Sequence, residues 1–275
     1  MFIEIGPASL VVYGEKEGMP YEFDRSRLEE KIQNILRDIR EYLPVLKQKA
    51  YKIKNTKHMP DVARKMVEAV KTIDEMSLTP MAAVAGSVSD ALKEHIKGEG
   101  LDIISVNNGG DISVFDRYEK GLKVGIGDIH TGRATSYTLD IKGFSDYGLA
   151  TSGFGGRSLT LGLADSVTVV AATGAVADAA ATFICNNTSI ITNQVRRIKA
   201  SEIDPLTDIP EEYVTVEINE LSEGVINDSL EKGLQLAFKI KIKKYIYDAI
   251  IKLKDHIVTT INGGYPIILE VHNGN

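Results

Sequence analysis

Residues 105–115 read "SVNNGGDISVF", in which two short strand-like runs are interrupted by the polar segment 107–111. Asn-Asn-Gly-Gly is favourable hairpin chemistry, because glycine and asparagine reach positive φ angles at little cost. An aspartate directly after two glycines also suits a ligand site, since bare backbone beside a carboxylate lets a phosphate or a metal come close. The stretch therefore predicts a hairpin and leaves two roles open for its centre, a plain turn or one wall of a site.

The composition around this hairpin is that of a globular α/β or α+β protein. The chain has 275 residues, 43% of them hydrophobic, which is enough for one large domain or two small ones. Its formal net charge is −6, with lysines and acids interspersed along the chain. No nucleic-acid-binding motif is present, so we expect no nucleic-acid partner.

Cysteine content and hydropathy indicate the compartment. The single cysteine, Cys185, cannot form an internal disulfide, which favours a reducing cytoplasm. No segment approaches the roughly 18 to 20 continuous apolar residues of a membrane span. We therefore expect neither a signal peptide nor a membrane-spanning helix.

Helices and strands alternate in the first hundred residues. Strand-like runs lie on both sides of the turn dipeptide Gly6-Pro7. Asp24 is expected to cap a long helix with apolar residues at spacings of three and four. A second helix is expected over residues 60–73. A third is expected after Thr79-Pro80, where a cap precedes proline at the first helical position.

From residue 101 to about 171 the pattern is that of strands separated by turn residues, which favours an antiparallel meander. A small-residue helix follows over residues 174–190, and the acidic, proline-bearing segment 202–212 is a candidate boundary. Beyond it we expect a strand over 213–218, a helix from about Asn227 and a closing strand over 263–271. Residues 239–253 are ambiguous, since their Lys/Ile alternation also suits an edge strand. Helices on one side of antiparallel sheets predict the α+β class.

The loop 149–158, "LATSGFGGRS", is a second candidate site. Thr151 and Ser152 offer hydroxyl groups, and the glycines leave amide groups unshielded, so the loop can form a concave nest for an anion. It is not a Walker loop, because the Gly-Lys-Ser/Thr ending is missing. The alternative is a flexible hairpin connection without a ligand.

The segment "VADAAAT", residues 176–182, is a third candidate. In a helix, Asp178 and Thr182 lie four residues apart and share one face. Their oxygens suit a hard cation such as magnesium or calcium, which prefers oxygen ligands. A simple contact between Asp and Thr, or a surface pair, is the competing interpretation.

Four motifs occur in an order that resembles the ApbE family, the FAD:protein FMN transferases, and especially its shorter branch. "AGSVSDAL" (85–92) is similar to the family's Lys-Gly-x-x-x-Asp helix, with Gly86 and Asp90 in place. "SVNNGGDI" resembles its Asn-x-Gly-Gly-Asp motif, and "KVGIGD" the strand that follows. "LATSG" matches Ala-Thr-Ser-Gly, and "SVTVVA…ADAAAT" a strand followed by an Ala-Asp-x-x-x-Thr helix. The motifs span about two fifths of the chain, residues 79–187.

This resemblance implies a single ApbE-like α+β domain over residues 1–275, related to the T-fold, with pseudo-duplicated halves and a ligand between them. Residues 1–78 would supply N-terminal strands and helices, 79–200 the motif-bearing core, and 201–275 a C-terminal subregion that completes the fold. By position in the motifs, Asp178 and Thr182 would hold magnesium, together with a carbonyl near residues 82–84. The positions that would contact FAD or FMN are Asn107, Asn108, Gly109, Gly110, Asp111, Thr151, Ser152, Gly153 and Arg157.

The sequence also departs from the family pattern. The transferases carry His-Ile-x-Asp-Pro-x-Thr-Gly after the Thr-Ser-Gly turn, whereas residues 154–166 contain no histidine. Ala85 replaces the motif lysine, Arg157 is a basic residue that can meet a phosphate, and His130 is a remote candidate for the pocket. No catalytic residue is assigned.

The resemblance implies flavin nucleotide transfer to an acceptor protein, or FAD diphosphate hydrolysis. The alternatives are a noncatalytic flavin or nucleotide carrier, with an accessory role in sulfur or homocysteine metabolism, and a scaffold that has lost the site. A phosphorylated small molecule is the expected partner in the first two cases. A homo-oligomer is left open.

Overall fold

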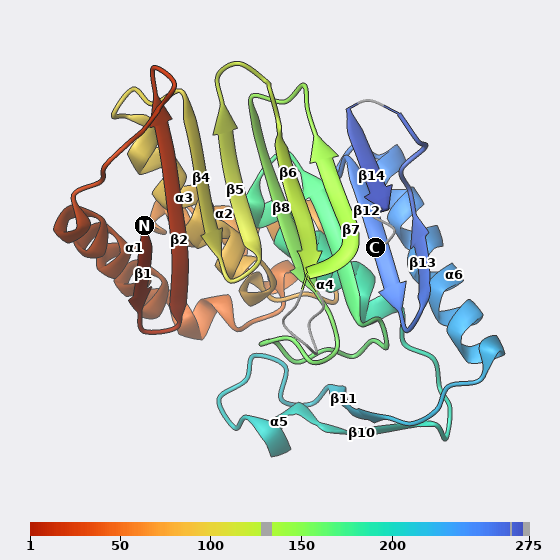
Figure 1. Cartoon of the computed structure of the whole chain (residues 1–275). Coiled ribbons are helices and arrows are strands. Elements are labelled where there is room, and N and C mark those ends of the chain that lie inside the picture. Colours follow the sequence, from red (N-terminus) through yellow and green to blue (C-terminus); the bar gives the residue numbers. More distant parts are fainter. Residues whose placement is uncertain (128–133, 265, 272–275) are drawn as a thin grey trace. The chain divides into compact units, whose positions relative to one another are not determined.

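The computed structural model describes residues 1–127, 134–264 and 266–271 (Figure 1). The chain forms two compact units. The first comprises residues 1–119, 144–150 and 170–180, and the second comprises 120–143, 151–169 and 181–275. Since the chain returns to the first unit twice, each unit is assembled from segments that are distant in sequence.

The strands of the first unit pair antiparallel. Their order is β1 (Phe2–Ile5), β2 (Ala8–Lys16), β4 (Ile103–Asn108), β5 (Asp111–Asp116) and β8 (Asp146–Ser152), with the short β3 (Met19–Pro20) also on β2. Alternate residues of β2 are buried, among them Ala8, Leu10 and Val12. This period of two gives the sheet one face for a core.

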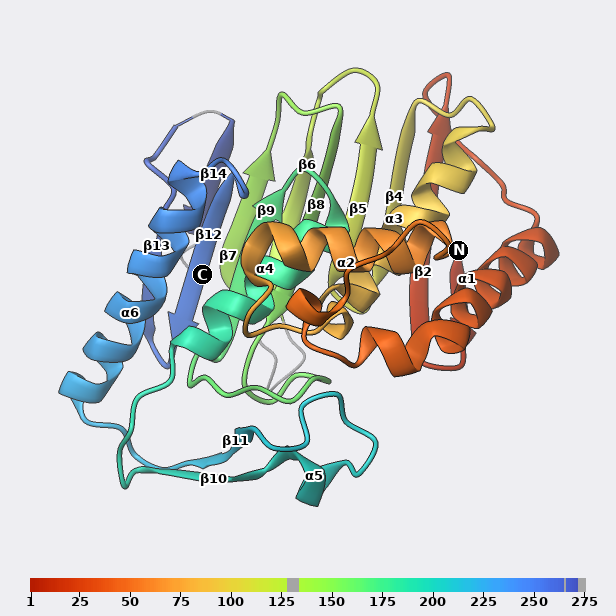
Figure 2. The ribbon, with the colours of Figure 1, turned by 180° about the vertical axis from the view of Figure 1, so that it is seen from behind.

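Helices cover that face. Figure 2 shows α1 (Arg25–Leu46), α2 (Asp61–Asp74) and α3 (Val84–Lys97) lying across β2, β4 and β5. The short 3-10 helices η1 (Ala50–Lys52) and η2 (Pro80–Ala83) connect them, and α4 (Gly174–Asn187) begins in this unit. Asp24 accepts hydrogen bonds from the amides of Ser26 and Arg27 and so caps α1. The apolar stripe of α1 packs into the core through Leu28, Ile32, Ile35, Ile39 and Leu46.

The second unit holds three groups of hydrogen-bonded strands. One has the order β14 (Ile267–Val271), β7 (Ala134–Ile141), β6 (Leu122–Gly127), and another has β9 (Ser166–Ala171), β12 (Asp248–Leu253), β13 (His256–Thr259). The third is the pair β10 (Val195–Lys199) and β11 (Tyr213–Ile218), joined through the short α5 (Ala200–Ile203). Helix α6 (Glu223–Ile242) packs against β12 and β13.

The α+β class and the antiparallel pairing are confirmed, and three local expectations are wrong. The strands of residues 101–171 do not form one meander, because β5 pairs with β8 while β6 and β7 pair with each other. The third helix starts with a 3-10 turn over residues 80–83, and Thr79 makes no side-chain cap. The helix expected from Asn227 begins at Glu223, and it absorbs the first part of the ambiguous segment 239–253, of which β12 takes the last part.

Within the described ranges, no helix has both the length and the apolar character that crossing a membrane requires.

Candidate functional site

The segment 107–111 is a tight hairpin between β4 and β5. Asn108 and Asp111 are register partners, and the two residues between them have positive φ, 65° at Gly109 and 112° at Gly110. Two successive positive φ angles match the twist of the strands on either side, which is the reason glycine is favoured there. The amide of Gly110 also donates to Asn107 Oδ1 at 2.8 Å. The hairpin prediction is confirmed.

This hairpin is fastened to the start of α3. Asn108 Nδ2 donates to the Ala85 carbonyl at 3.4 Å, and Asn108 Oδ1 accepts from the Ser9 amide at 3.2 Å. One turn further along α3, Ser89 Oγ donates to the Asp111 carbonyl at 2.7 Å. Asn108 and Asp111 are both buried. The polar residues of the motif therefore position the hairpin, whether or not they also contact a ligand.

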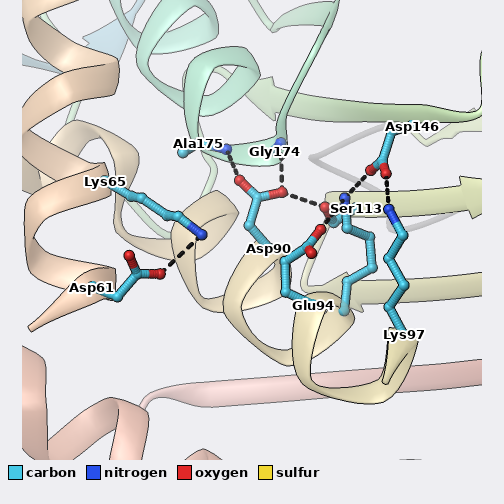
Figure 3. A network of polar contacts seen from close by, with 10 residues as sticks. Asp61, Lys65, Asp90, Glu94, Lys97, Ser113, Asp146, Gly174 and Ala175 are labelled. Atoms are coloured by element: carbon cyan, nitrogen blue, oxygen red, sulfur yellow. Dashed lines mark hydrogen bonds and ion pairs between the residues drawn. The ribbon is translucent and has the colours of Figure 1, made fainter. Parts of the chain in front are cut away.

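Helices α3 and α4 cap each other through carboxylates, and Figure 3 shows the half of this arrangement that Asp90 makes. Asp90 of α3 accepts from the amides of Gly174 and Ala175, the first residues of α4, at 2.9 Å each. In the opposite direction, Asp178 of α4 accepts from the amide of Gly86 in the first turn of α3 at 3.0 Å. These first-turn amides have no partner inside their own helices, and a negative charge is favourable at a helix N-terminus.

Glycines make this mutual capping sterically feasible. A Cβ atom on Gly86 would lie 2.1 Å from the Gly174 carbonyl oxygen, and one on Gly148 of β8 would lie 2.1 Å from the Gly174 amide nitrogen. The backbones of α3, β8 and the start of α4 thus touch without intervening side chains. The small residues that the sequence shows in both helices serve this close approach.

Burial sets the electrostatics of Asp178. Asp178 is half-buried, and the protein atoms around its carboxylate desolvate it. Desolvation raises the pKa of Asp178 to about 7, against the lowering effect of hydrogen bonds from the Gly86 and Ala85 amides, and the charge of Asp90 adds to the rise. A carboxylate with this pKa would gain from a nearby cation, because a cation stabilises its ionised form.

The metal candidates Asp178 and Thr182 lie one turn apart on α4, and both are partly exposed. In residues 1–127, 134–264 and 266–271, no cluster of three or more His, Cys, Asp or Glu side chains forms a metal site. A divalent ion on α4 would therefore depend on one carboxylate, a hydroxyl and backbone carbonyls. Such all-oxygen donors fit magnesium, which usually binds through one or two carboxylates and keeps several waters.

The Thr-Ser-Gly candidates belong to the second unit. The hydroxyls of Thr151 and Thr168 are 2.9 Å apart, and Ser152 is hydrogen-bonded to the thiol of Cys185. Beyond β8 the chain turns, with the Phe154 amide bonded to the Ala164 carbonyl at 2.9 Å. Arg157 is exposed on this turn. The remote candidate His130 lies outside the described residues.

Cys185 lies in the core of the protein. It is fully buried, and burial raises the pKa of its thiol to about 11. A thiol with this pKa stays protonated at neutral pH and is a poor nucleophile.

A cavity of about 450 Å³ lies beside Asp90, between α2, α3 and the start of α4. Its charged side chains are matched by protein partners. Lys65 pairs with Asp61 at 2.9 Å, Glu68 with Arg64 at 2.8 Å, and the buried Lys93 with Asp146 and Glu94.

Asp146 also binds Lys97 at 2.6 Å, so these pairs clamp α3 to β8 (Figure 3). The cavity is thus lined by an internal charge network that already serves the fold.

The sequence motifs include Asp90, but they do not predict that it caps α4. They also do not point to Ser113, Gly148 or Lys93. Ser113 Oγ donates to Asp90, and Ser113 is the register partner of Gly148. The available signal was the spacing of Gly86 and Asp90, which places both on one face of a helix. Their partners on α4 are more than eighty residues away in sequence.

Comparison with known proteins agrees with the motifs. A family model described as "AbpE bacteria" matches residues 1–259. A UPF0280 protein of Methanosarcina barkeri is 36% identical over 136 residues, 48% of this chain and 50% of the relative. Another, of Methanococcus aeolicus, is 33% identical over 162 residues, 56% of this chain and 60% of the relative. The chain thus spans about half the length of the curated relatives that it matches.

Among solved structures, the apo form of the flavinyl transferase ApbE of Pseudomonas stutzeri matches with a TM-score of 0.50 and 13% identity, over 94% of this chain and 93% of that chain. At this identity the match shows the fold. Because the family model covers nearly the whole chain, this protein belongs to the AbpE bacteria family and is an ApbE-like protein.

Proposed function

We propose that this protein binds a flavin nucleotide, FAD or FMN, together with magnesium, and that it acts in flavin nucleotide transfer or FAD diphosphate hydrolysis. Membership of an ApbE-like family supports a flavin-related role. The solved structure that this chain resembles in fold is a flavinyl transferase, which suggests the reaction class.

The observation that carries the proposal is the state of Asp178. Its carboxylate is desolvated, its pKa is raised to about 7, and it lies one helical turn before Thr182. We propose that these two side chains hold magnesium, with a backbone carbonyl near residues 82–84. Bound there, the ion would neutralise the charge of a diphosphate.

The remaining candidates take positioning roles. In the first unit, Asn107, Asn108, Gly109, Gly110 and Asp111 form a rigid turn whose two glycines leave backbone open to a ligand. In the second unit, Thr151, Ser152 and Gly153 would contact the nucleotide, and the exposed Arg157 can meet a phosphate.

In the proposed reaction, a hydroxyl of an acceptor Thr or Ser, or a water molecule, attacks the phosphorus on the FMN side of FAD. The diphosphate P–O bond breaks and AMP leaves. The products are a flavinylated protein or free FMN. We retain a cytoplasmic location as part of the proposal, on the basis of the single thiol Cys185.

A noncatalytic flavin carrier is the second candidate, and two features of the chain favour it. Residues 154–166 contain no histidine, and Ala85 stands where the family motif has lysine. Binding of metal and phosphate would survive these replacements, whereas a step that needs the missing histidine would not.

The test is incubation with FAD and MgCl₂, with AMP and FMN measured by chromatography and flavin affinity measured by fluorescence quenching. Asp178→Asn should abolish AMP release. Asp61→Asn is the matched control, because Asp61 also lies in the first turn of a helix but is exposed and paired with Lys65. Flavin binding without AMP would support the carrier.

A wild type that neither binds flavin nor gains stability from it would refute both candidates. A ligand present at 100 times its dissociation constant adds about 2.7 kcal/mol to the free energy of unfolding, which a thermal-shift assay detects.

A further inference from the structure

The first turn of α4 is held by hydrogen bonds from its backbone amides to two side chains. Asp90 accepts from the Gly174 and Ala175 amides, and Thr173 Oγ1 accepts from the Val176 amide at 3.2 Å. Ser113 Oγ donates to the same Asp90 carboxylate from β5, so the carboxylate is held on two sides. Asp90, which is 5% exposed, therefore binds two of the first amides of this helix.

Asp178 lies four residues after Gly174, directly above the turn that Asp90 holds. A helix is rigid over one turn, so a displacement of residues 174–175 moves the Asp178 carboxylate with it. Asp178 Oδ2 reaches the Gly86 amide at 3.0 Å, and Gly86 lies one turn before Asp90 on the same helix.

We infer that Asp90 is a positioning residue for Asp178. It fixes the first turn of α4 so that the Asp178 carboxylate faces the start of α3 in the orientation that metal binding needs. The functional half of this inference, that Asp90 supports metal binding, rests on the proposed magnesium site. The geometric half, that Asp90 orients the Asp178 carboxylate, rests only on the hydrogen bonds of the two carboxylates.

A purely structural role for Asp90 predicts a different outcome. Separate ion pairs hold α3 against the sheet, because Asp146 of β8 binds Lys93 and Lys97 of α3. Asp146 is therefore the matched comparison. It is an aspartate of the same unit, and in the described part of the chain its side chain binds Lys93 and Lys97 of the same helix, α3.

The experiment compares Asp90→Asn with Asp146→Asn in the full chain, using Mn²⁺ as the probe. The amount of free Mn²⁺, followed by electron paramagnetic resonance, gives the metal affinity. Hydrogen exchange of the Gly86 amide, followed by NMR, reports the position of Asp178 without any metal. Ser113→Ala is a milder third variant, because it removes one donor to Asp90 and leaves both α4 amides capped.

We expect Asp90→Asn to weaken Mn²⁺ binding at least tenfold and to speed exchange at Gly86. Asp146→Asn should change both by less than twofold, and Ser113→Ala should lie between them. If Asp90→Asn does not fold, an unchanged Mn²⁺ affinity and an unchanged Gly86 exchange in Ser113→Ala would overturn the inference.

Equal effects of Asp90→Asn and Asp146→Asn would also overturn it, because Asp90 would then act only through stability. If the wild type binds no Mn²⁺, the magnesium proposal fails. The Gly86 exchange rates then decide the geometric half, which is refuted if Asp90→Asn leaves them unchanged.

Discussion

Asp90 and Asp178 each accept hydrogen bonds from the first-turn amides of the helix that carries the other. Helix α3 has no side-chain cap of its own, because Ala83 occupies its N-cap position. Its first turn therefore depends on Asp178. The motif residues of two distant segments thus complete one structural unit before any ligand is considered.

Gly86→Ala should destabilise the protein by roughly 3 kcal/mol or more, since the new Cβ would lie 2.1 Å from the Gly174 carbonyl oxygen and backbone cannot give way cheaply. Gly224→Ala in α6 is the control, because nothing lies within 4 Å of its Cβ position. There, alanine should stabilise by up to about 1 kcal/mol. Urea denaturation measures both, and similar values for the two variants would contradict the close helix contact.

The raised pKa of Asp178 predicts a pH dependence of stability when divalent cations are absent. A carboxyl whose folded-state pKa is about 7, above its unfolded value of 3.8, contributes stability that is fully present below about pH 4. This contribution is lost as the pH rises through 7. Between pH 5 and pH 8 the loss should be roughly 2.5 kcal/mol.

Asp178→Asn should remove this contribution to the change of the free energy of unfolding with pH, whatever its effect on the stability at a single pH. Urea denaturation at pH 5 and pH 8 measures it. Identical slopes for wild type and Asp178→Asn would show that the pKa of this group is not raised.

Asp146→Asn should destabilise by roughly 2 kcal/mol, because it removes the main partner of Lys93, whose side chain is 3% exposed. The partial exposure of Asp146 keeps the figure below that of a fully buried pair. Glu217→Gln breaks the exposed pair with Arg196 and should cost no more than about 0.5 kcal/mol. Chemical denaturation distinguishes the two, and an equally small loss in Asp146→Asn would contradict the clamp.

The two hairpin glycines should differ in what they tolerate. Gly109 has a φ of 65°, within the left-handed helical region that asparagine adopts readily, so Gly109→Asn should change stability by less than about 1 kcal/mol. Gly110 has a φ of 112°, where any side chain is strained, so Gly110→Ala should destabilise by about 1 to 3 kcal/mol. Thermal unfolding measures the stability of the two variants. A larger loss in Gly109→Asn than in Gly110→Ala would contradict this turn geometry.

Elements that depend on neighbouring residues could be predicted from the sequence. The α1 cap at Asp24, the positive φ angles at Gly109 and Gly110, and the strands on both sides of Gly6-Pro7 all follow from local preferences. The strand partners of β5 could not be predicted, because pairing depends on where residues 120–145 go. Residues 122–127 and 134–141 form strands of the second unit, and β8 pairs with β5 instead.

The same division holds for the candidate site. By itself the sequence determined the hairpin, the small-residue helices and the order of motifs that shows the family, because these depend on residue type and spacing. Only the tertiary structure decided that Asp90 caps α4 and Asp178 caps α3, and that "SVNNGGDISVF" is fastened to α3 through Asn108 and Ser89. Such contacts join segments up to 92 residues apart, and desolvation of the Asp178 carboxylate exists only after those segments have packed together.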